Sequence, residues 1–248
     1  MKHERRDSRR VLQELLEVHN LSLGDAQYAF LERHLDFVIA TNDAIRLTAI
    51  VDRDKAERLH IIDSLLVLPE VCAAPTGPLL DMGSGGGFPG IPLAVVSGRE
   101  TDLLDSVQKK ARAVQSFLDS EQQTQRQSVV PPIRSLGMRA EELALEYPAH
   151  YSVVTARALS SLPSLVELAT PLLSFGGRLI ALKGKRDPGE IARGVKAAQK
   201  TGMILVDERE YALKGGGEQR SVVVFERANE SQVMLPRRLG KAQRTPLA

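Results

Sequence analysis

The sequence contains no tryptophan, only four tyrosines and six phenylalanines among 248 residues. So few aromatic side chains argue against a sheet surface that stacks nucleic-acid bases. The single cysteine, Cys72, cannot form an internal disulfide, which fits a reducing compartment. No apolar run approaches the roughly 20 residues that cross a bilayer, and the charged segment 1–10 has no apolar stretch behind it, so it is no secretory signal. We therefore expect a cytoplasmic protein without membrane contact.

The charge is nearly balanced, with 33 basic and 31 acidic side chains and a formal net charge of +2. This balance hides basic clusters in segments 1–10, 183–186 and 231–248. Such clusters at both ends of a balanced chain suggest a polyanionic partner such as nucleic acid. They are equally compatible with solvated termini that keep a protein soluble.

Apolar periodicity predicts three helices in the first seventy residues, and alternating strands and helices after a Pro/Gly-containing joint at 73–78. Alternation of this kind, closed by a hairpin, predicts an α/β fold with a mostly parallel seven-stranded sheet, helices on both faces and one antiparallel strand. The predicted strands are 79–82, 103–105, 133–136, 151–155, 178–182, 204–213 and 221–225. The predicted helices are 11–18, 22–38, 54–68, 89–97, 106–122, 162–173 and one from 188.

A glycine-rich loop, Asp81-Met82-Gly83-Ser84-Gly85-Gly86-Gly87-Phe88-Pro89-Gly90, joins the first strand to the next helix, where an open α/β sheet binds its ligand. It is no P-loop, because Ile91 and Pro92 follow Gly90 in place of Lys and Ser or Thr. Gly85, Gly87 and Gly90 satisfy the spacing of a dinucleotide loop. Asp81 would lie unhelpfully close to a pyrophosphate, however, so this interpretation is weaker.

An S-adenosylmethionine loop fits the same stretch better, with Gly83, Gly85 and Gly87 at the turn and Asp81 just upstream. This ligand has no phosphates and carries a sulfonium and an ammonium, so an acid beside the glycines is useful. Asp105, at the end of the second strand, would accept hydrogen bonds from the ribose hydroxyls. A glycine-rich turn that binds nothing stays open as an alternative.

The loop and its continuation through Ile91-Pro92-Leu93-Ala94 closely resemble the bacterial 16S ribosomal RNA guanine-N7 methyltransferase G family, also called the glucose-inhibited division protein B family. The resemblance runs from about Leu47 to Leu247, although Arg46 stands where the family usually has Asn. Further matching motifs follow in the family's order: His60-Ile61-Ile62-Asp63-Ser64, Leu104-Asp105-Ser106 with Lys109-Lys110, Arg139-Ala140-Glu141-Glu142, Thr155-Ala156-Arg157-Ala158, Ala181-Leu182-Lys183-Gly184 and Pro236-Arg237-Arg238-Leu239-Gly240.

The resemblance implies a class I, Rossmann-like methyltransferase domain (73–230) behind a helical N-terminal extension (1–72), with a basic C-terminal tail (231–248). It implies S-adenosyl-L-methionine as cofactor and N7 of one guanine in 16S ribosomal RNA, free or in the 30S subunit, as the acceptor. The residues it assigns to the cofactor are Gly83, Gly85 and Phe88 for methionine and adenosine, Asp105 and Ser106 for ribose, Ala140 and Glu141 for the adenine edge, and Arg157 to close the pocket. With Gly87 of the loop, these form the predicted cofactor site.

Guanine N7 carries a free lone pair, so its methylation needs positioning and electrostatic shaping rather than a general base. Arg157 and Lys183, each just after a strand, are our candidate catalytic residues for contacts with phosphate or guanine O6, unless they form ion pairs at the sheet rim. His60 and Asp63 lie one helical turn apart and either face the site or tie their helix to the sheet. The histidines never pair at metal-ligand spacing, so we expect no metal.

Three other functions stay open: a methyltransferase with another substrate, a nicotinamide-dependent oxidoreductase, and an RNA-binding module without catalysis. We expect a monomer. The tail from Ser231 has little core-forming pattern, so we expect it to become ordered on RNA or to pack late. Its deletion should then weaken RNA affinity and leave cofactor affinity unchanged.

Overall fold

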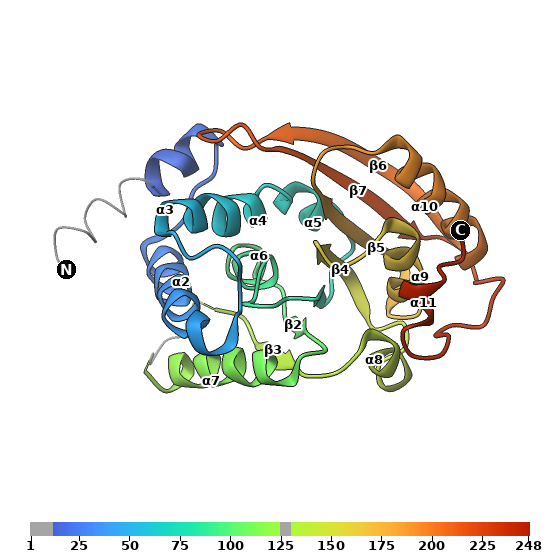
Figure 1. The fold of residues 1–248 in the computed structure, drawn as a ribbon, viewed down its shortest axis with the longest axis horizontal. Coiled ribbons are helices and arrows are strands. Elements are labelled where there is room, and N and C mark those ends of the chain that lie inside the picture. Colours follow the sequence, from blue (N-terminus) through green and yellow to red (C-terminus); the bar gives the residue numbers. More distant parts are fainter. Residues whose placement is uncertain (1–11, 125–129) are drawn as a thin grey trace.

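The computed structural model describes residues 12–124 and 130–248, whose seven strands form one sheet in the order β3-β2-β1-β4-β5-β7-β6 (Figure 1). Strands β1 to β5 are parallel, and β7 is antiparallel to both of its neighbours. The strands are β1 Leu79–Met82, β2 Thr101–Leu104, β3 Ile133–Leu136, β4 Tyr151–Arg157, β5 Leu173–Lys183, β6 Met203–Ala212 and β7 Gln219–Arg227. The predicted mostly parallel sheet with one antiparallel strand is confirmed.

Both faces of the sheet are apolar. Leu79 and Val153 lie in one buried cluster, and their chain neighbours Leu80 and Val154 lie in another on the opposite face. Each face is therefore covered by helices. The Leu80 face carries α8 (Ala140–Glu146), α9 (Leu162–Ala169), α10 (Pro188–Thr201) and α11 (Lys241–Arg244), and the other face carries α5 (Leu68–Ala73), α6 (Gly90–Ser97) and α7 (Gln108–Thr124) (Figure 1).

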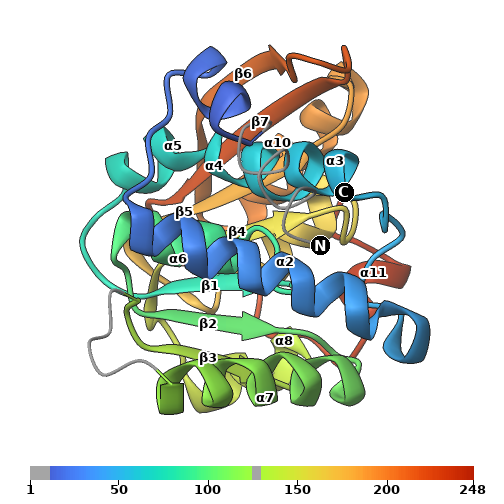
Figure 2. The same cartoon turned by 90° about the vertical axis from the view of Figure 1, so that its left-hand side faces the viewer.

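The helices before β1 share a core with the strand–helix units. Helix α2 (Asp25–Ile45) buries Leu31 and Leu35 in the same cluster as Phe88 and Ile91. Figure 2 shows α2 lying across α6, outside the sheet. Consequently, residues 12–72 of the N-terminal extension are packed onto the sheet domain rather than standing apart from it.

The segment predicted as one helix over 54–68 is divided. It consists of α3 (Arg53–Ala56), the π-helical η1 (Glu57–Ile62) and α4 (Asp63–Leu65), and α5 begins at Leu68. Pro69 therefore lies in the first turn of α5 and not after a helix end, a position where its missing N–H is tolerated. π-helical turns are rare in proteins overall, and those that occur often lie at functional sites. This one carries His60.

Three other elements differ from the prediction. The short helix α8 was not predicted, and β5 begins at Leu173, before Gly176-Gly177, where a helix end had been expected. Helix α9 ends earlier, at Ala169. Within residues 12–124 and 130–248, no helix combines the length and the apolar character that crossing a membrane requires.

The C-terminal tail packs against the fold, which differs from one expected alternative, order on RNA alone, and is compatible with the other, late packing. Ala242 of α11 is buried in the core cluster of the Leu80 face. Arg237 pairs with Glu167 of α9, and the Gly240 N–H donates to Glu141 Oε1 at 2.7 Å. A single buried alanine and an ion pair produce no apolar periodicity, so this packing was not predictable from sequence.

Candidate functional site

A cleft of about 1140 Å³ opens at the carboxyl ends of the parallel strands. One wall comes from the strand ends and the glycine loop and includes the predicted residues Gly83, Gly85, Phe88, Asp105, Arg157 and Lys183. The other wall comes from the N-terminal helices and the segment after α2, including Arg46, Thr48, His60 and Asp63. The predicted sheet-edge site is therefore closed by the N-terminal region.

The glycine loop turns sharply between β1 and α6. The N–H groups of Gly83 and Ser84 both donate to the Leu104 carbonyl, at 2.7 and 3.1 Å. Gly83 has φ 76°, and a Cβ there would meet Leu159 at 2.7 Å. Gly87 has φ 92°, and its Cβ would meet Ile91 at 2.6 Å. Positive φ and these close approaches require glycine at both positions.

Asp105 holds the loop against the end of β2. Its carboxylate accepts from the Gly85 N–H at 3.0 Å and from the Val107 N–H at 2.8 Å. Each oxygen thus has one partner, and a carboxylate oxygen has room for a second donor. Because Asp105 also lines the cleft, it can accept a hydrogen bond from a ligand hydroxyl.

Asp81, expected beside the cationic groups of a ligand, does not line the cleft. It is fully buried, accepts from the Gly90 N–H at 2.8 Å and from the Thr155 hydroxyl at 2.9 Å, and so fixes the loop from beneath. Burial raises the pKa of Asp81 to about 6, against the lowering effect of these hydrogen bonds. Its role in this structure is to hold the loop.

Phe88 connects the loop to the N-terminal helices. Its ring stacks on His60 with centroids 4.5 Å apart and lies 4.6 Å from the ring of His34 on α2. His34 Nε2 is 2.7 Å from the Gly86 carbonyl, so it carries the proton and donates. Burial lowers the pKa of His34 to about 4, and burial together with the Arg157 charge lowers that of His60 to about 3. Both rings are neutral near pH 7.

The lowered pKa of His34 predicts a pH-dependent stability. The unfolded chain binds this proton near pH 6.5 and the folded chain only near pH 4, so stability is complete above pH 6.5 and is lost as the pH falls toward 4. His34→Gln keeps a donor for Gly86 and removes the titration. We expect its free energy of unfolding, from urea melts, to fall less steeply between pH 6.5 and 4.5, by up to about 1.4 kcal/mol per pH unit. Parallel curves would contradict this.

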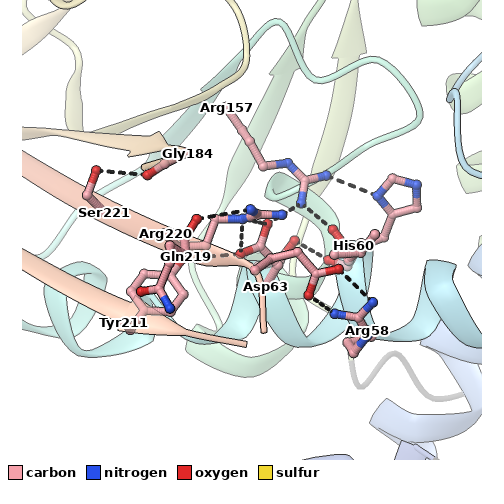
Figure 3. A network of polar contacts seen from close by, with 12 residues as sticks. Arg58, His60, Asp63, Arg157, Gly184, Tyr211, Gln219, Arg220 and Ser221 are labelled. Carbon is pink, nitrogen blue, oxygen red and sulfur yellow. Dashed lines mark hydrogen bonds and ion pairs between the residues drawn. The ribbon is translucent and has the colours of Figure 1, made fainter. Parts of the chain in front are cut away.

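Arg157 links the end of β4 to η1 and α4. Its guanidinium donates to the Leu59 carbonyl at 2.9 Å, to Asp63 at 3.3 Å, and lies 3.3 Å from His60 Nδ1. Figure 3 shows Arg157 pointing toward His60 and Asp63. Arg157 thus has two roles at the same time: it lines the cleft, and it forms an ion pair with Asp63.

Asp63 is the centre of this network. Besides Arg157, it accepts from Tyr211 of β6 at 3.2 Å and pairs with Arg220 of β7 at 3.3 Å (Figure 3). Asp63 thus ties its helix to the sheet and also lines the cleft, and His60 both touches Arg157 and lines the cleft, so the two alternatives expected for this pair occur together.

Lys183, at the end of β5, also lines the cleft and is also paired. Its ammonium donates to Glu190 at 2.8 Å and to the Ser160 carbonyl at 3.1 Å. An ammonium has one more N–H than these two contacts use. Lys183 can therefore still donate to a ligand without losing its ion pair.

Four predicted site residues lie outside the lining of this cleft: Gly87, Ser106, Ala140 and Glu141. The Gly87 N–H donates to the Ser84 carbonyl, and a Cβ at this position would meet Ile91 of α6 and His34. Glu141 is buried and bonded to the tail, as described above. Conversely, His34 and Thr48 were not predicted as site residues, since nothing in the local sequence marks a residue that reaches the site or its glycine loop from another element.

The topology, the glycine loop and the sheet-edge cleft define the class I methyltransferase fold. A solved SAM-dependent methyltransferase from Methanosarcina mazei shares this fold, with a TM-score of 0.50 and 14% identity, over 65% of this chain and 98% of that one. At this identity the likeness speaks for the fold alone.

Sequence comparison identifies the family. A model of the family rRNA small subunit methyltransferase G matches residues 27–222. A ribosomal RNA small subunit methyltransferase G from Chloroflexus aggregans is 35% identical over 97% of this chain and 99% of its own length. One from Streptococcus pneumoniae is 30% identical over 94% of this chain and 97% of its own. The chain belongs to the rRNA small subunit methyltransferase G family.

Proposed function

We propose that this protein transfers a methyl group from S-adenosyl-L-methionine to N7 of a guanine in 16S ribosomal RNA. Support comes from the relatives at 30–35% identity, which are named for the small-subunit RNA, and from the observed cleft. The observation that carries the cofactor assignment is that N–H groups of the glycine loop already donate hydrogen bonds within the protein. The N–H groups of Gly87 and Phe88 donate to the Ser84 carbonyl, and that of Gly90 donates to Asp81.

These donors are unavailable to a pyrophosphate, which needs free N–H groups at the helix N-terminus. A phosphate-free nucleoside cofactor has no such need. Asp105 has acceptor capacity for ribose hydroxyls, and Gly83, Gly85 and Phe88 line the same cleft. We place the methionine and adenosine parts along these residues, with Ser106 beside the ribose and Ala140 and Glu141 at the adenine edge. The cofactor supplies an electrophilic methyl group when bound.

We assign the guanine to the side of the cleft that holds Arg157 and Lys183. Each is held by ion pairs yet keeps donors for guanine O6 or a phosphate. N7 needs no deprotonation, which agrees with a cleft whose histidine, His60, has a pKa near 3. These residues would orient the base in line with the methyl group, so positioning supplies the catalysis.

The direct test uses methyl-labelled S-adenosylmethionine and small ribosomal subunits from cells that lack this activity. After incubation, cleavage chemistry specific for N7-methylguanine locates the label. Label at a single guanine supports cofactor, acceptor and position together. If S-adenosylhomocysteine binds but no subunit or free 16S RNA becomes labelled, the acceptor assignment is wrong.

We further propose a monomer that acts in the cytoplasm, where small subunits are assembled. We propose that the chain is divided by function into three parts: an N-terminal extension (1–72), a methyltransferase domain (73–230) and a tail (231–248). The shared core and the packed tail indicate that these parts fold together.

A further inference from the structure

Two basic residues on the cleft have no acidic partner. Five basic side chains line the cleft, and the three described above are paired with Asp63 or Glu190. Arg46 and Lys110 form no ion pair or side-chain hydrogen bond with any residue in 12–124 or 130–248. Neither charge on the lining of the cleft is thus engaged by an acidic side chain.

Arg46 also adopts a backbone conformation that does not suit arginine. It follows α2 as its C-cap with φ 56° and ψ 58°, and its N–H donates to the Asn42 carbonyl at 2.8 Å. Glycine and asparagine are the usual residues at a left-handed helix end, because other side chains crowd the backbone there. Neither the cap hydrogen bond nor the packing uses the exposed guanidinium. Strained residues of this kind are often kept for function.

The two residues come from elements that end or begin at the same edge of the sheet. Figure 2 shows the C-terminal end of α2 on the side to which β2 points, where α7 begins with Lys110 in its first turn. Both line the cleft that holds the glycine loop and Asp105. An extended polyanion lying across this cleft would meet both charges.

We propose that Arg46 and Lys110 bind two backbone phosphates of the RNA substrate and so hold the target nucleotide over the cleft. This inference rests on the proposed function and adds the residues that dock the acceptor. Arg46 provides a planar, bidentate phosphate contact, and Lys110 a point charge. The backbone of Arg46 is strained, and its positive charge is the function that accounts for an arginine at this position. The backbone of Lys110 lies in a regular helix and is not strained.

The test compares Arg46→Asn, Arg46→Lys and Lys110→Gln in the full-length protein. Arg46→Asn should raise the melting temperature by about 2 °C, because Asn relieves the left-handed strain. It should also weaken binding of 16S RNA about fivefold near 100 mM salt and reduce the slope of log K against log salt by about 0.7–0.9. Arg46→Lys should keep most of the slope. Lys110→Gln should reduce the slope equally with an unchanged melting temperature.

Ala149→Asn is the matched control, because Ala149 is exposed, has φ 50° and does not line the cleft. It should raise the melting temperature without changing RNA binding. S-adenosylhomocysteine affinity should stay within twofold in every variant. RNA binding by Arg46→Asn with wild-type affinity and salt slope would overturn the inference, as would a fall in its melting temperature. If the wild-type protein transfers no methyl group, the proposed function fails, and the direct RNA-binding comparison still decides this inference.

Discussion

Replacing Arg157 with alanine is expected to lower the rate of methyl transfer by roughly 100-fold or more while the chain still folds. Arg157 holds Leu59 and His60 of η1 against the cleft, and its guanidinium lies 5.9 Å from the Phe88 ring centroid. Without Arg157, η1 would lose these contacts, and the wall of the cleft that would orient the base would no longer be held in place. Asp63 keeps Tyr211 and Arg220, so no buried charge is left unpaired.

Single-turnover transfer to small subunits measures the rate, and NMR titration of His60 provides a readout that is independent of activity. Because the Arg157 charge helps to lower the pKa of His60, that pKa should rise toward 6.5 in the variant. Arg157→Lys keeps the charge without the planar fork and should recover only part of the activity. A variant that fails to fold would make Arg157 structural. Wild-type rates would remove it from the catalytic proposal.

Deleting residues 231–248 is expected to lower the free energy of unfolding by about 3–5 kcal/mol, because it removes one partner of a buried ion pair. Glu167 has a side chain only 2% exposed and would lose Arg237. The core would also be opened at Ala242. Urea unfolding of the full and truncated chains measures the loss.

The same deletion should weaken cofactor binding, in contrast to the expectation from sequence, because Glu141 at the start of α8 would lose the Gly240 N–H. Arg238→Gln together with Lys241→Gln is the matched control. It removes two exposed tail charges and leaves these contacts intact. A truncated protein as stable as the full chain would show that the tail packing contributes nothing.

The sheet and the glycine loop were predictable from sequence because their signals are local. Apolar runs that enter glycines mark β1 and its loop, and Asp105 follows the next strand directly. The wall that completes the cleft was not predictable, because Arg46 and Thr48 are separated from the loop by tens of residues and meet it only through packing. Arg157 was predictable from its position at the end of a strand and from family resemblance, but its contacts with η1 and α4 were not.

Ion pairs were the other feature that sequence could not place. Asp63 gathers Arg157 and Arg220 from two strands far along the chain. Acids and bases on distant elements have no spacing rule that pairs them, unlike charges on one helix. For the same reason the tail contact between Arg237 and Glu167 was invisible until the elements were placed.

The contact between α2 and the glycine loop limits how this sequence can diverge. His34 holds the Gly86 carbonyl, and a Cβ at Gly87 would lie 3.1 Å from His34 Nε2. A side chain at Gly87 would therefore press on a helix more than fifty positions earlier in the chain, in addition to Ile91 at 2.6 Å in α6. We therefore expect α2 and the loop to change together during evolution. If either one were grafted alone into a related protein, it would contact a segment that does not match it.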